Sequence, residues 1–380
     1  MPAPEPPEQQ TPTEAWVARP NNKLNLESIH YSTLAPHEVL VDIVAASLCH
    51  TDIRTAAGTF HLSPPLILGH EASGYVRSVG SSVTYVHPGD AVVLAYASCG
   101  ECRRCEMGKV AYCEQLFQLN FSGREGAAHD VEGKEVHGLF FGQSSMARVA
   151  LVRERSCVRI SSPCSREELR GFASLGCGVQ TGAGAIMNVA KPAKGARIVV
   201  FGAGAVGLSA VMAARLREPE RLVLVDNSAV KLEMISRELL GGVVVVNSAA
   251  LSHDELVAKL KGLTADGRGM DYALDCVGHE AVVNAAYQCL DKMGMVMNVG
   301  GSATARPQYE VERNLVNGLT IRGTHQGDSD PRVMIPQLIE MHRAGSFPFD
   351  KLLTSFGFED LHKAIEDTHV GRVIKPILFT

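Results

Sequence analysis

The chain lacks a long hydrophobic run, a basic tract and an apolar amino-terminal segment. Its longest apolar stretch, around residues 198–214, contains three glycines in a phosphate-loop pattern, so we expect it in a core rather than a bilayer. The net charge of −5 and the scattered Lys and Arg residues argue against general binding to nucleic acid or to anionic membranes. The Pro- and Glu-rich beginning, MPAPEPPEQQTPTE, has no apolar centre, which excludes a secretory signal peptide and predicts a disordered tail over residues 1–12.

The sequence does contain ten cysteines, and four of them form a C-x2-C-x2-C-x7-C run. These four are Cys99, Cys102, Cys105 and Cys113. Closely spaced thiolates in one short lobe suit the tetrahedral coordination of Zn²⁺. Disulfides and an iron–sulfur cluster are the alternatives, but the missing secretory signal favours a reducing compartment and a bound metal. The run therefore predicts a structural zinc.

The patterning along the chain changes once, near residue 195. Before it, short strand signals such as 37–47, 71–83 and 90–97 alternate with Gly, Pro and Asp, which predicts a β-rich partial barrel with functional loops. After it, strand and helix patterns alternate, which is typical of a parallel sheet with helices on both faces. We expect strands at 196–204, 221–226, 243–247, 270–278, 294–301, 319–324 and 373–379, and helices at 205–217, 227–239, 331–345 and 358–371.

Gly202, Gly204 and Gly207 form a G-x-G-x-x-G motif between an expected strand and an expected helix. That context is the one a dinucleotide-binding loop requires, with the phosphates on the amides at the helix start. Asp226 ends the next strand, where a carboxylate accepts hydrogen bonds from the ribose hydroxyls and repels a 2′-phosphate. The motif predicts NAD. The alternative interpretation of Asp226 is an ordinary surface aspartate at the end of a strand. Lys231 could lie over the same ribose or be a solvated helix lysine.

Three further segments carry metal-type ligands: Cys49 in SLCHTD, His70 and Glu71 in LGHEASG, and Cys177 in LGCGVQTGAG. With the cysteine lobe and the glycine motif, they resemble the zinc-dependent medium-chain alcohol dehydrogenases, in the aryl- and allylic-alcohol branch. The resemblance runs from about residue 13 to the last residue. It implies an α/β chain with a GroES-like β-rich catalytic domain (13–178 and 325–380) and a Rossmann NAD-binding domain (179–324). It also implies two zinc ions per chain, a cytoplasmic homodimer or homotetramer, and a small-molecule alcohol or aldehyde substrate.

The resemblance assigns Cys49, His70 and Cys177 to a catalytic zinc, an open site of the Cys2His type. Around it, Glu71 is a carboxylate near the metal, Asp52 orients the histidine ligand, and Thr51 carries the proton of the alcohol.

Cofactor and substrate positions follow from the same resemblance. The cations that face the NAD pyrophosphate are His50 and Lys375. The contacts around the nicotinamide are Thr181, Val206 and Val277. The residues of the substrate channel are Phe60, Ala95 and Tyr96, for which ordinary packing is the alternative interpretation. The pattern assigns no ligand role to Cys157, Cys164, Cys276 and Cys289, which we expect to be small buried or surface residues.

One position departs from the family pattern. Arg54 stands where many members have the histidine that ends the proton relay, and a guanidinium is not a usable base near neutral pH. The relay is therefore expected to end on water or on His50.

The sequence predicts hydride transfer between NAD and a primary aryl or allylic alcohol. One alternative is an S-hydroxymethylglutathione dehydrogenase, which needs a basic residue for the glutathione carboxylate that the sequence does not assign. A reductase of C=C or C=N bonds and a non-catalytic relative are the others, and the intact Thr51 and zinc ligands count against both.

Overall fold

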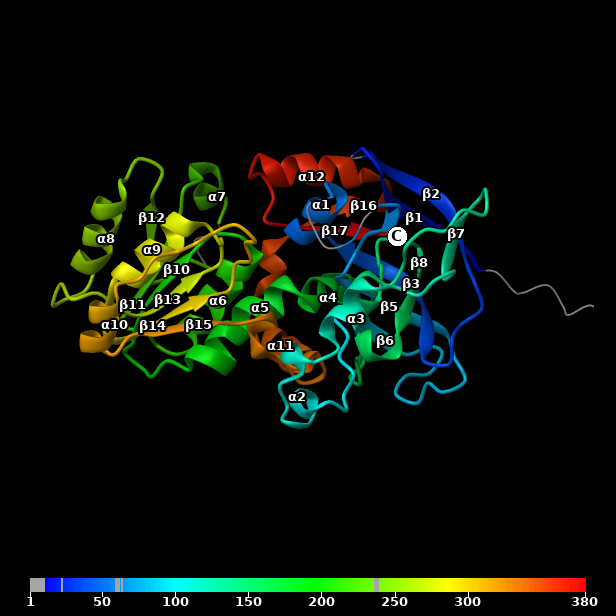
Figure 1. Cartoon of the computed structure of the whole chain (residues 1–380), viewed down its shortest axis with the longest axis horizontal. Coiled ribbons are helices and arrows are strands. Elements are labelled where there is room, and N and C mark those ends of the chain that lie inside the picture. The colour runs from blue at the N-terminus through cyan, green and yellow to red at the C-terminus, as the bar shows by residue number, and fades with distance from the viewer. Residues whose placement is uncertain (1–10, 22, 59–61, 63, 236–238) are drawn as a thin grey trace, which may run out of the picture. The chain divides into compact units, whose positions relative to one another are not determined.

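The structure is a computed structural model that describes residues 11–21, 23–58, 62, 64–235 and 239–380. The chain divides into two compact units (Figure 1). Unit 1 comprises the residues up to Cys177, Thr354–Ile365 and Pro376–Thr380, and unit 2 comprises Gly178–Leu353 and Glu366–Lys375. The first boundary lies next to the expected one at residue 178.

The second boundary differs from the expected one at residue 325. Residues 325–353 belong to unit 2, because the turn Gln326–Asp328 and helix α11 (Pro331–Arg343) pack against α5 (Gly178–Gly184) of that unit. The last two residues of the disordered tail predicted over residues 1–12 are ordered instead. Thr11 and Pro12 belong to the first strand, where they pair with Tyr31 and His30.

Unit 1 is rich in antiparallel strands. They are β1 (Thr11–Arg19), β2 (Lys23–Tyr31), β3 (Glu38–Ser47), β4 (Leu66–Ile67), β5 (Ala72–Val79), β6 (Ala91–Leu94), β7 (Ala128–Asp130), β8 (Val149–Arg153), β9 (Cys157–Arg159), β16 (Leu353–Gly357) and β17 (Lys375–Phe379). They form a four-stranded sheet in the order β4-β1-β2-β7 and a seven-stranded sheet in the order β16-β17-β3-β5-β6-β9, with β8 paired to β3.

Short helices connect these strands. They are α1 (His50–Ala56), α2 (Arg103–Glu106), α3 (Leu116–Phe121) and α4 (Arg166–Phe172). Alternate residues of β1, such as Ala15 and Val17, pack with Ile29 of β2 and Leu151 of β8 in a buried apolar cluster. The sheets thus form a stable support from which the loops after β3, β4 and β6 project.

Unit 2 is built on a parallel six-stranded sheet in the order β12-β11-β10-β13-β14-β15. Its strands are β10 (Arg197–Phe201), β11 (Arg221–Asp226), β12 (Val243–Asn247), β13 (Met270–Asp275), β14 (Leu290–Asn298) and β15 (Thr320–Gly323). Its other helices are the π-helix Ala185–Ala190, α6 (Ala205–Arg215), α7 (Ala229–Met234), α8 (His253–Gly262), α9 (Glu280–Gln288), α10 (Val311–Asn317) and α12 (Leu361–His369), which begins in unit 1. This confirms the predicted α/β class with a doubly wound sheet.

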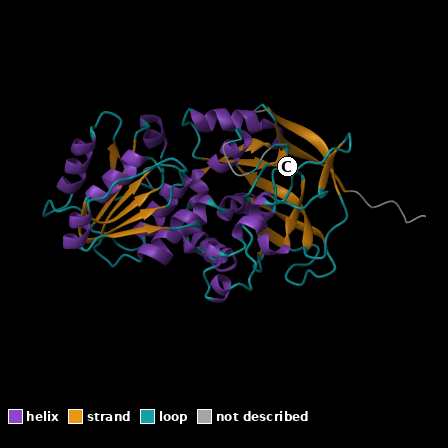
Figure 2. Cartoon of the chain, in the orientation of Figure 1, coloured by secondary structure: helices purple, strands orange, loops and turns teal. Residues whose placement is uncertain are grey.

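Both faces of the sheet in unit 2 are covered by helices (Figures 1 and 2). Val199 and Val223 pack with Leu260 of α8 and Ala286 of α9 on one face. Val200 points to the other face, where α6 approaches it closely at Gly207. A strand buried on both faces reads as a continuous apolar run, which is why these strands could be located from the sequence. Within the described residues, no helix is long and apolar enough to cross a membrane.

Candidate active site and metal centres

The four cysteines of the lobe converge on one point. All four Sγ atoms lie within 4.8 Å of one another, with distances of 3.5 Å for Cys113–Cys99, 3.9 Å for Cys99–Cys105 and 4.0 Å for Cys102–Cys113. A disulfide needs sulfurs about 2 Å apart, so these are free thiols. Four sulfurs at about 2.3 Å from a central ion in a tetrahedron lie about 3.8 Å from one another. The cluster therefore has the dimensions of a tetrahedral zinc site.

Backbone amides of the lobe point at these sulfurs. The N–H of Cys102 donates to Cys99 Sγ over 3.3 Å, and that of Glu114 donates to Cys102 Sγ over 3.4 Å. The Glu114 amide, with a smaller contribution from the Cys105 amide, lowers the pKa of Cys102 to about 6. Burial raises the pKa of Cys105 to about 12, so a cation is needed to keep all four residues as thiolates.

Cys105→Ala is expected to lower the melting temperature and to remove one zinc ion per chain. The reason is that a structural zinc contributes folding free energy directly and needs all four ligands. Thermal denaturation with zinc analysis measures both effects. Cys157→Ala is the control, because Cys157 is also buried but lies outside the cluster. Equal melting temperatures for the two variants would contradict the structural role of the lobe.

A second cluster joins Cys49, His70, Glu71 and Cys177, whose ligand atoms lie within 4.8 Å of one another. Cys49 caps the start of α1, His70 and Glu71 lie between β4 and β5, and Cys177 precedes α5. All four residues belong to unit 1. Segments far apart in the sequence therefore bring two thiols, an imidazole and a carboxyl group together.

Asp52 fixes the imidazole of His70. Its Oδ1 lies 3.0 Å from His70 Nδ1 and accepts the N–H of Gly69, while its Oδ2 accepts the N–H of Cys49. Burial opposes protonation of His70, but Asp52 and Cys49 outweigh it and raise its pKa well above 6.5. His70 Nε2 is buried and has no hydrogen-bond partner among the described residues. A ring held at Nδ1, with Nε2 directed into the sulfur cluster, is the arrangement of a metal-binding histidine.

Two glycines permit the close approach of these segments. Gly69 has a φ of +99°, and a Cβ there would lie 2.1 Å from the backbone nitrogen of Met146. A Cβ on Gly176 would lie 2.2 Å from the carbonyl oxygen of Leu94. Both residues directly precede a residue of the cluster, so a side chain at either position would displace His70 or Cys177.

Asp52→Asn is expected to weaken metal binding at the second cluster about 10- to 100-fold, as for other groups that orient ligands. The amide would present an NH2 group to one of the N–H donors that the carboxylate now accepts. Chelator competition measures the affinity. Asp130→Asn is the control, because Asp130 is also buried and hydrogen-bonded in unit 1 but lies away from the cluster. Unchanged metal affinity in Asp52→Asn would contradict the orienting role.

Thr51 lies beside the second cluster in the first turn of α1. Its Oγ1 is 3.8 Å from Cys49 Sγ, and its carbonyl oxygen accepts the hydroxyl of Thr55. Arg54 is half-buried on the same helix, and His50 begins the helix and is exposed. The hydroxyl of Thr51 is thus within reach of a ligand bound at the cluster.

In unit 2 the glycine motif forms the expected turn. Gly202 has a φ of +100°, and a Cβ on Gly207 would lie 1.8 Å from the carbonyl oxygen of Gly202. A Cβ on Gly204 would meet nothing within 4 Å, which leaves open space before the first residue of α6. Val277 borders the turn, since its Cγ2 would lie 3.0 Å from a Cβ on Gly202.

Asp226 has a second contact that the sequence did not reveal. Its Oδ2 accepts the N–H of Ala203, inside the glycine turn, over 2.7 Å, and its Oδ1 accepts the N–H of Ser228 over 2.8 Å. The carboxylate at the end of β11 therefore holds the turn in place, with further lone pairs left for other donors.

The other expected cofactor positions also lie in unit 2, except His50, which lies in unit 1. A Cβ on Gly178 would lie 3.8 Å from Val206 Cγ2 and 3.9 Å from Lys375 Nζ, so a buried cation approaches the start of α6. A helix start beside an ammonium group suits an anion such as phosphate. Thr181 donates its hydroxyl to Oε1 of Gln326. Lys231, on α7, packs its stem near Gly371.

The expected substrate residues are only partly visible. Ala95 and Tyr96 follow β6 directly and are buried. Phe60 lies outside the described residues. The substrate role of these residues stays a prediction.

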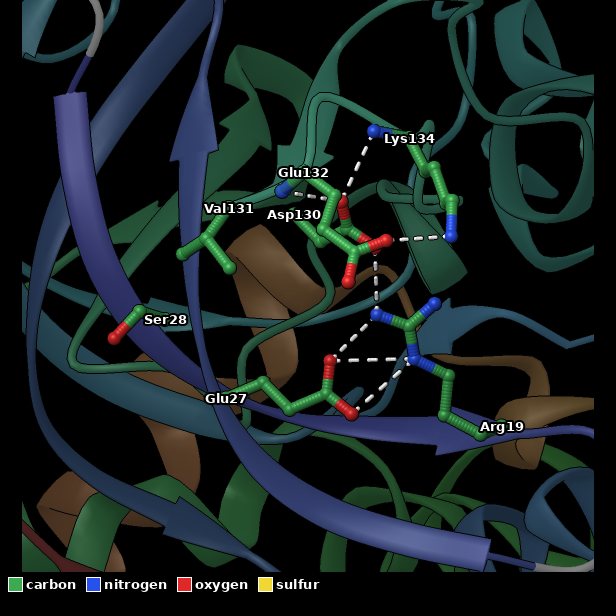
Figure 3. Close-up of a pocket in the computed structure, with 7 residues that line it drawn as sticks. All are labelled: Arg19, Glu27, Ser28, Asp130, Val131, Glu132 and Lys134. Atoms are coloured by element: carbon green, nitrogen blue, oxygen red, sulfur yellow. Dashed lines mark hydrogen bonds and ion pairs between the residues drawn. The ribbon is translucent and has the colours of Figure 1, made fainter.

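A surface hollow of about 430 Å³ elsewhere in unit 1 is lined by side chains that form an ion-pair network, which indicates a structural role (Figure 3). Arg19 bridges Glu27 at 2.6 Å and Asp130 at 2.9 Å. Burial opposes ionisation of Asp130, but the Arg19 hydrogen bond and backbone amides outweigh it and lower its pKa. The charges satisfy one another and link β1, β2 and β7.

Known proteins resemble this chain in sequence. The family model described as alcohol dehydrogenase GroES-like domain matches residues 35–162, and the one described as zinc-binding dehydrogenase matches residues 205–342. Geraniol dehydrogenase of Castellaniella defragrans is 37% identical over 362 residues, covering 93% of this chain and 94% of that protein. The chain belongs to the zinc-type medium-chain alcohol dehydrogenase family.

Solved structures of the family have the same fold as this chain. An alcohol dehydrogenase zinc-binding domain protein from Burkholderia ambifaria aligns with a TM-score of 0.90 at 37% identity, over 98% of this chain and 99% of that one. Benzyl alcohol dehydrogenase of Acinetobacter calcoaceticus aligns with a TM-score of 0.88 at 34% identity, over 97% and 99%. The GroES-like and Rossmann-like domains inferred from the sequence are thereby confirmed.

Proposed function

We propose that this alcohol dehydrogenase interconverts a primary aryl or allylic alcohol and its aldehyde, with NAD and two zinc ions per chain. The observation that carries the proposal is the convergence of Cys49 and Cys177 on His70, whose buried imidazole Asp52 orients. Two thiolates and one neutral imidazole form the ligand set of an alcohol dehydrogenase zinc site, which keeps one position open.

Bound zinc would supply Lewis acidity for the alcohol or aldehyde oxygen, and NAD would accept or donate the hydride. The protein's own residues do the rest. Asp52 holds His70 in one tautomer and orientation, Glu71 places a carboxyl group beside the ligands, and Thr51 accepts and passes on the proton of the alcohol. In unit 2, Lys375 and the start of α6 would bind the pyrophosphate.

The substrate class rests on relatives and on aromatic side chains near His70. Two of the relatives are a geraniol and a benzyl alcohol dehydrogenase. Phe140 and Phe141 both contact the His70 ring. Side-by-side assays of NADH formation with cinnamyl alcohol, geraniol and S-hydroxymethylglutathione test the class. The proposal requires higher kcat/KM with the first two, and preference for the glutathione adduct would favour the alternative.

NAD is expected to be preferred over NADP by about a hundredfold or more in kcat/KM, because Asp226 would face the 2′-phosphate. Asp226→Asn, which removes the charge but keeps an oxygen for the N–H of Ala203, should narrow the gap. Asp226→Gly should narrow it too, and should also loosen the glycine turn. Steady-state kinetics with both cofactors measures this. Comparable kcat/KM values in the wild type would contradict the role of Asp226.

A homo-oligomer is also proposed, with a cytoplasmic location that stays a prediction. Unit 2 supports self-association, because β15 is an edge strand with an exposed Ile321, and Val311, Leu315 and Val316 of α10 are exposed as well. Open strand edges and exposed apolar side chains are typical of surfaces that associate with other proteins. Light scattering of the purified protein distinguishes a monomer from a dimer or tetramer.

A further inference from the structure

The segment from Leu139 to Met146 adopts an unfavourable backbone conformation next to the second cluster. Leu139, Phe141 and Ser144 have φ values of 58°, 53° and 49°, in the left-handed region that side-chain-bearing residues avoid. Such conformations persist only where the surroundings impose them, and they are concentrated at functional sites. The segment lies in unit 1, as His70 does.

Hydrogen bonds fasten this segment to the residues that lead to His70. Ser144 Oγ donates to the carbonyl oxygen of Ile67 over 2.8 Å and accepts the N–H of Phe140 over 3.0 Å. The N–H of Ser145 donates to the carbonyl oxygen of Gly69 over 3.0 Å. The bonds to Ile67 and Gly69 join the left-handed segment to the loop that carries the histidine, and the bond from Phe140 stays within the segment. The strained segment therefore holds its position relative to that loop.

The result is an aromatic enclosure of the imidazole. The Phe141 ring is stacked on His70, with 4.6 Å between centroids and 28° between planes. Phe140 meets the same imidazole edge-on, at 5.7 Å and 78°. Phe121 of α3 in turn packs edge-on against Phe141, with 4.9 Å between centroids and 76° between planes. Gln143 donates from Nε2 to the carbonyl oxygens of His70 and Ala95, which fixes the backbone beneath the ring.

We propose that Phe141 is a positioning residue that sets the ring plane of His70 for metal binding. Asp52 fixes the direction of Nδ1, but one hydrogen bond leaves the ring free to tilt about it. A stacked ring removes that tilt, because any rotation of the imidazole plane meets the face of Phe141. Together the two constraints aim the Nε2 lone pair at the sulfur cluster. The inference rests on the proposed metal role of His70.

Phe141→Leu tests it, because leucine keeps an apolar side chain but has no flat ring to stack. In zinc-loaded protein, release to a chromogenic chelator should show two phases, of which the one missing in Cys177→Ala belongs to the second cluster. Phe141→Leu should accelerate that phase about tenfold, the size expected for a group that orients a metal ligand. The other phase, from the cysteine lobe, should not change. Phe141→Tyr, which restores the ring, should return the wild-type rate.

Two further variants keep the test decisive. Phe117→Leu is the matched control, since the Phe117 ring also contacts Phe121, with 5.1 Å between centroids and 53° between planes, but is 58% exposed. Phe141→Met is a second ring-free replacement, flexible enough to fill the space if leucine impairs folding. Wild-type release rates in a folded ring-free variant would overturn the positioning role alone. A wild-type protein without the second phase would instead contradict the proposed function itself.

Discussion

Cys177→Ala is expected to abolish alcohol oxidation while the protein stays folded and still binds NAD. Its Sγ is one of three ligand atoms that would hold the catalytic zinc, and alanine offers no replacement. Loss of one of only three protein ligands should empty the site, and the Lewis acidity that the reaction requires is lost with the metal. NADH formation should fall to the background rate, with one zinc ion remaining per chain.

Cys164→Ala is the matched control, because Cys164 is a half-buried cysteine outside both clusters. It should retain wild-type turnover and both zinc ions. Quenching of protein fluorescence by NAD and the melting temperature establish that Cys177→Ala is intact. Residual turnover above a few per cent in a variant that has lost the metal would contradict catalysis at this cluster.

Thr51→Val is expected to lower kcat for alcohol oxidation by about 10² to 10⁴, the usual contribution of a positioned proton-transfer group. Valine keeps the shape of the side chain but removes the hydroxyl, which lies 3.8 Å from Cys49 Sγ at the edge of the cluster. Arg54, on the same helix, cannot accept the proton because a guanidinium remains charged at neutral pH.

Thr51→Ser is the control, since it restores a hydroxyl at the same position and should recover most of the rate. Zinc analysis must show that Thr51→Val retains both metals. If Thr51→Val kept a near-wild-type kcat with its zinc bound, the proton would have to leave by another route. The alternative of C=C or C=N reduction would then gain support.

Much of the candidate site could be predicted because its residues lie in short contiguous motifs. The spacing of Cys99, Cys102, Cys105 and Cys113 alone constrains four sulfurs to one lobe, and the structure brings them within 4.8 Å. The strand at Arg221–Asp226 was located to the residue, since a buried strand between polar ends has clear limits. Cys49, His70 and Cys177 could be grouped only through the family resemblance, because nothing local links positions so far apart.

Other features had no signal in the sequence. The left-handed turns at Leu139 and Phe141 are formed by bulky residues that give no turn pattern, and only tertiary contacts impose them. The hydrogen bond from Thr181 to Gln326 joins residues 145 positions apart. Periodicity located helix α11 but could not say which unit it packs on. Helix α7 ends at Met234 rather than at the expected residue 239, and residues 236–238 lie outside the described part.

The zinc content of freshly purified, active protein is the most direct test of a zinc-dependent alcohol dehydrogenase with separate structural and catalytic sites. Seven ligands in two clusters predict two zinc ions per chain. Atomic emission would measure the zinc concentration, and amino-acid analysis the protein concentration. Two per chain in a preparation that oxidises cinnamyl alcohol or geraniol with NAD is the expected result. One zinc ion or none per chain, at full activity, would contradict it.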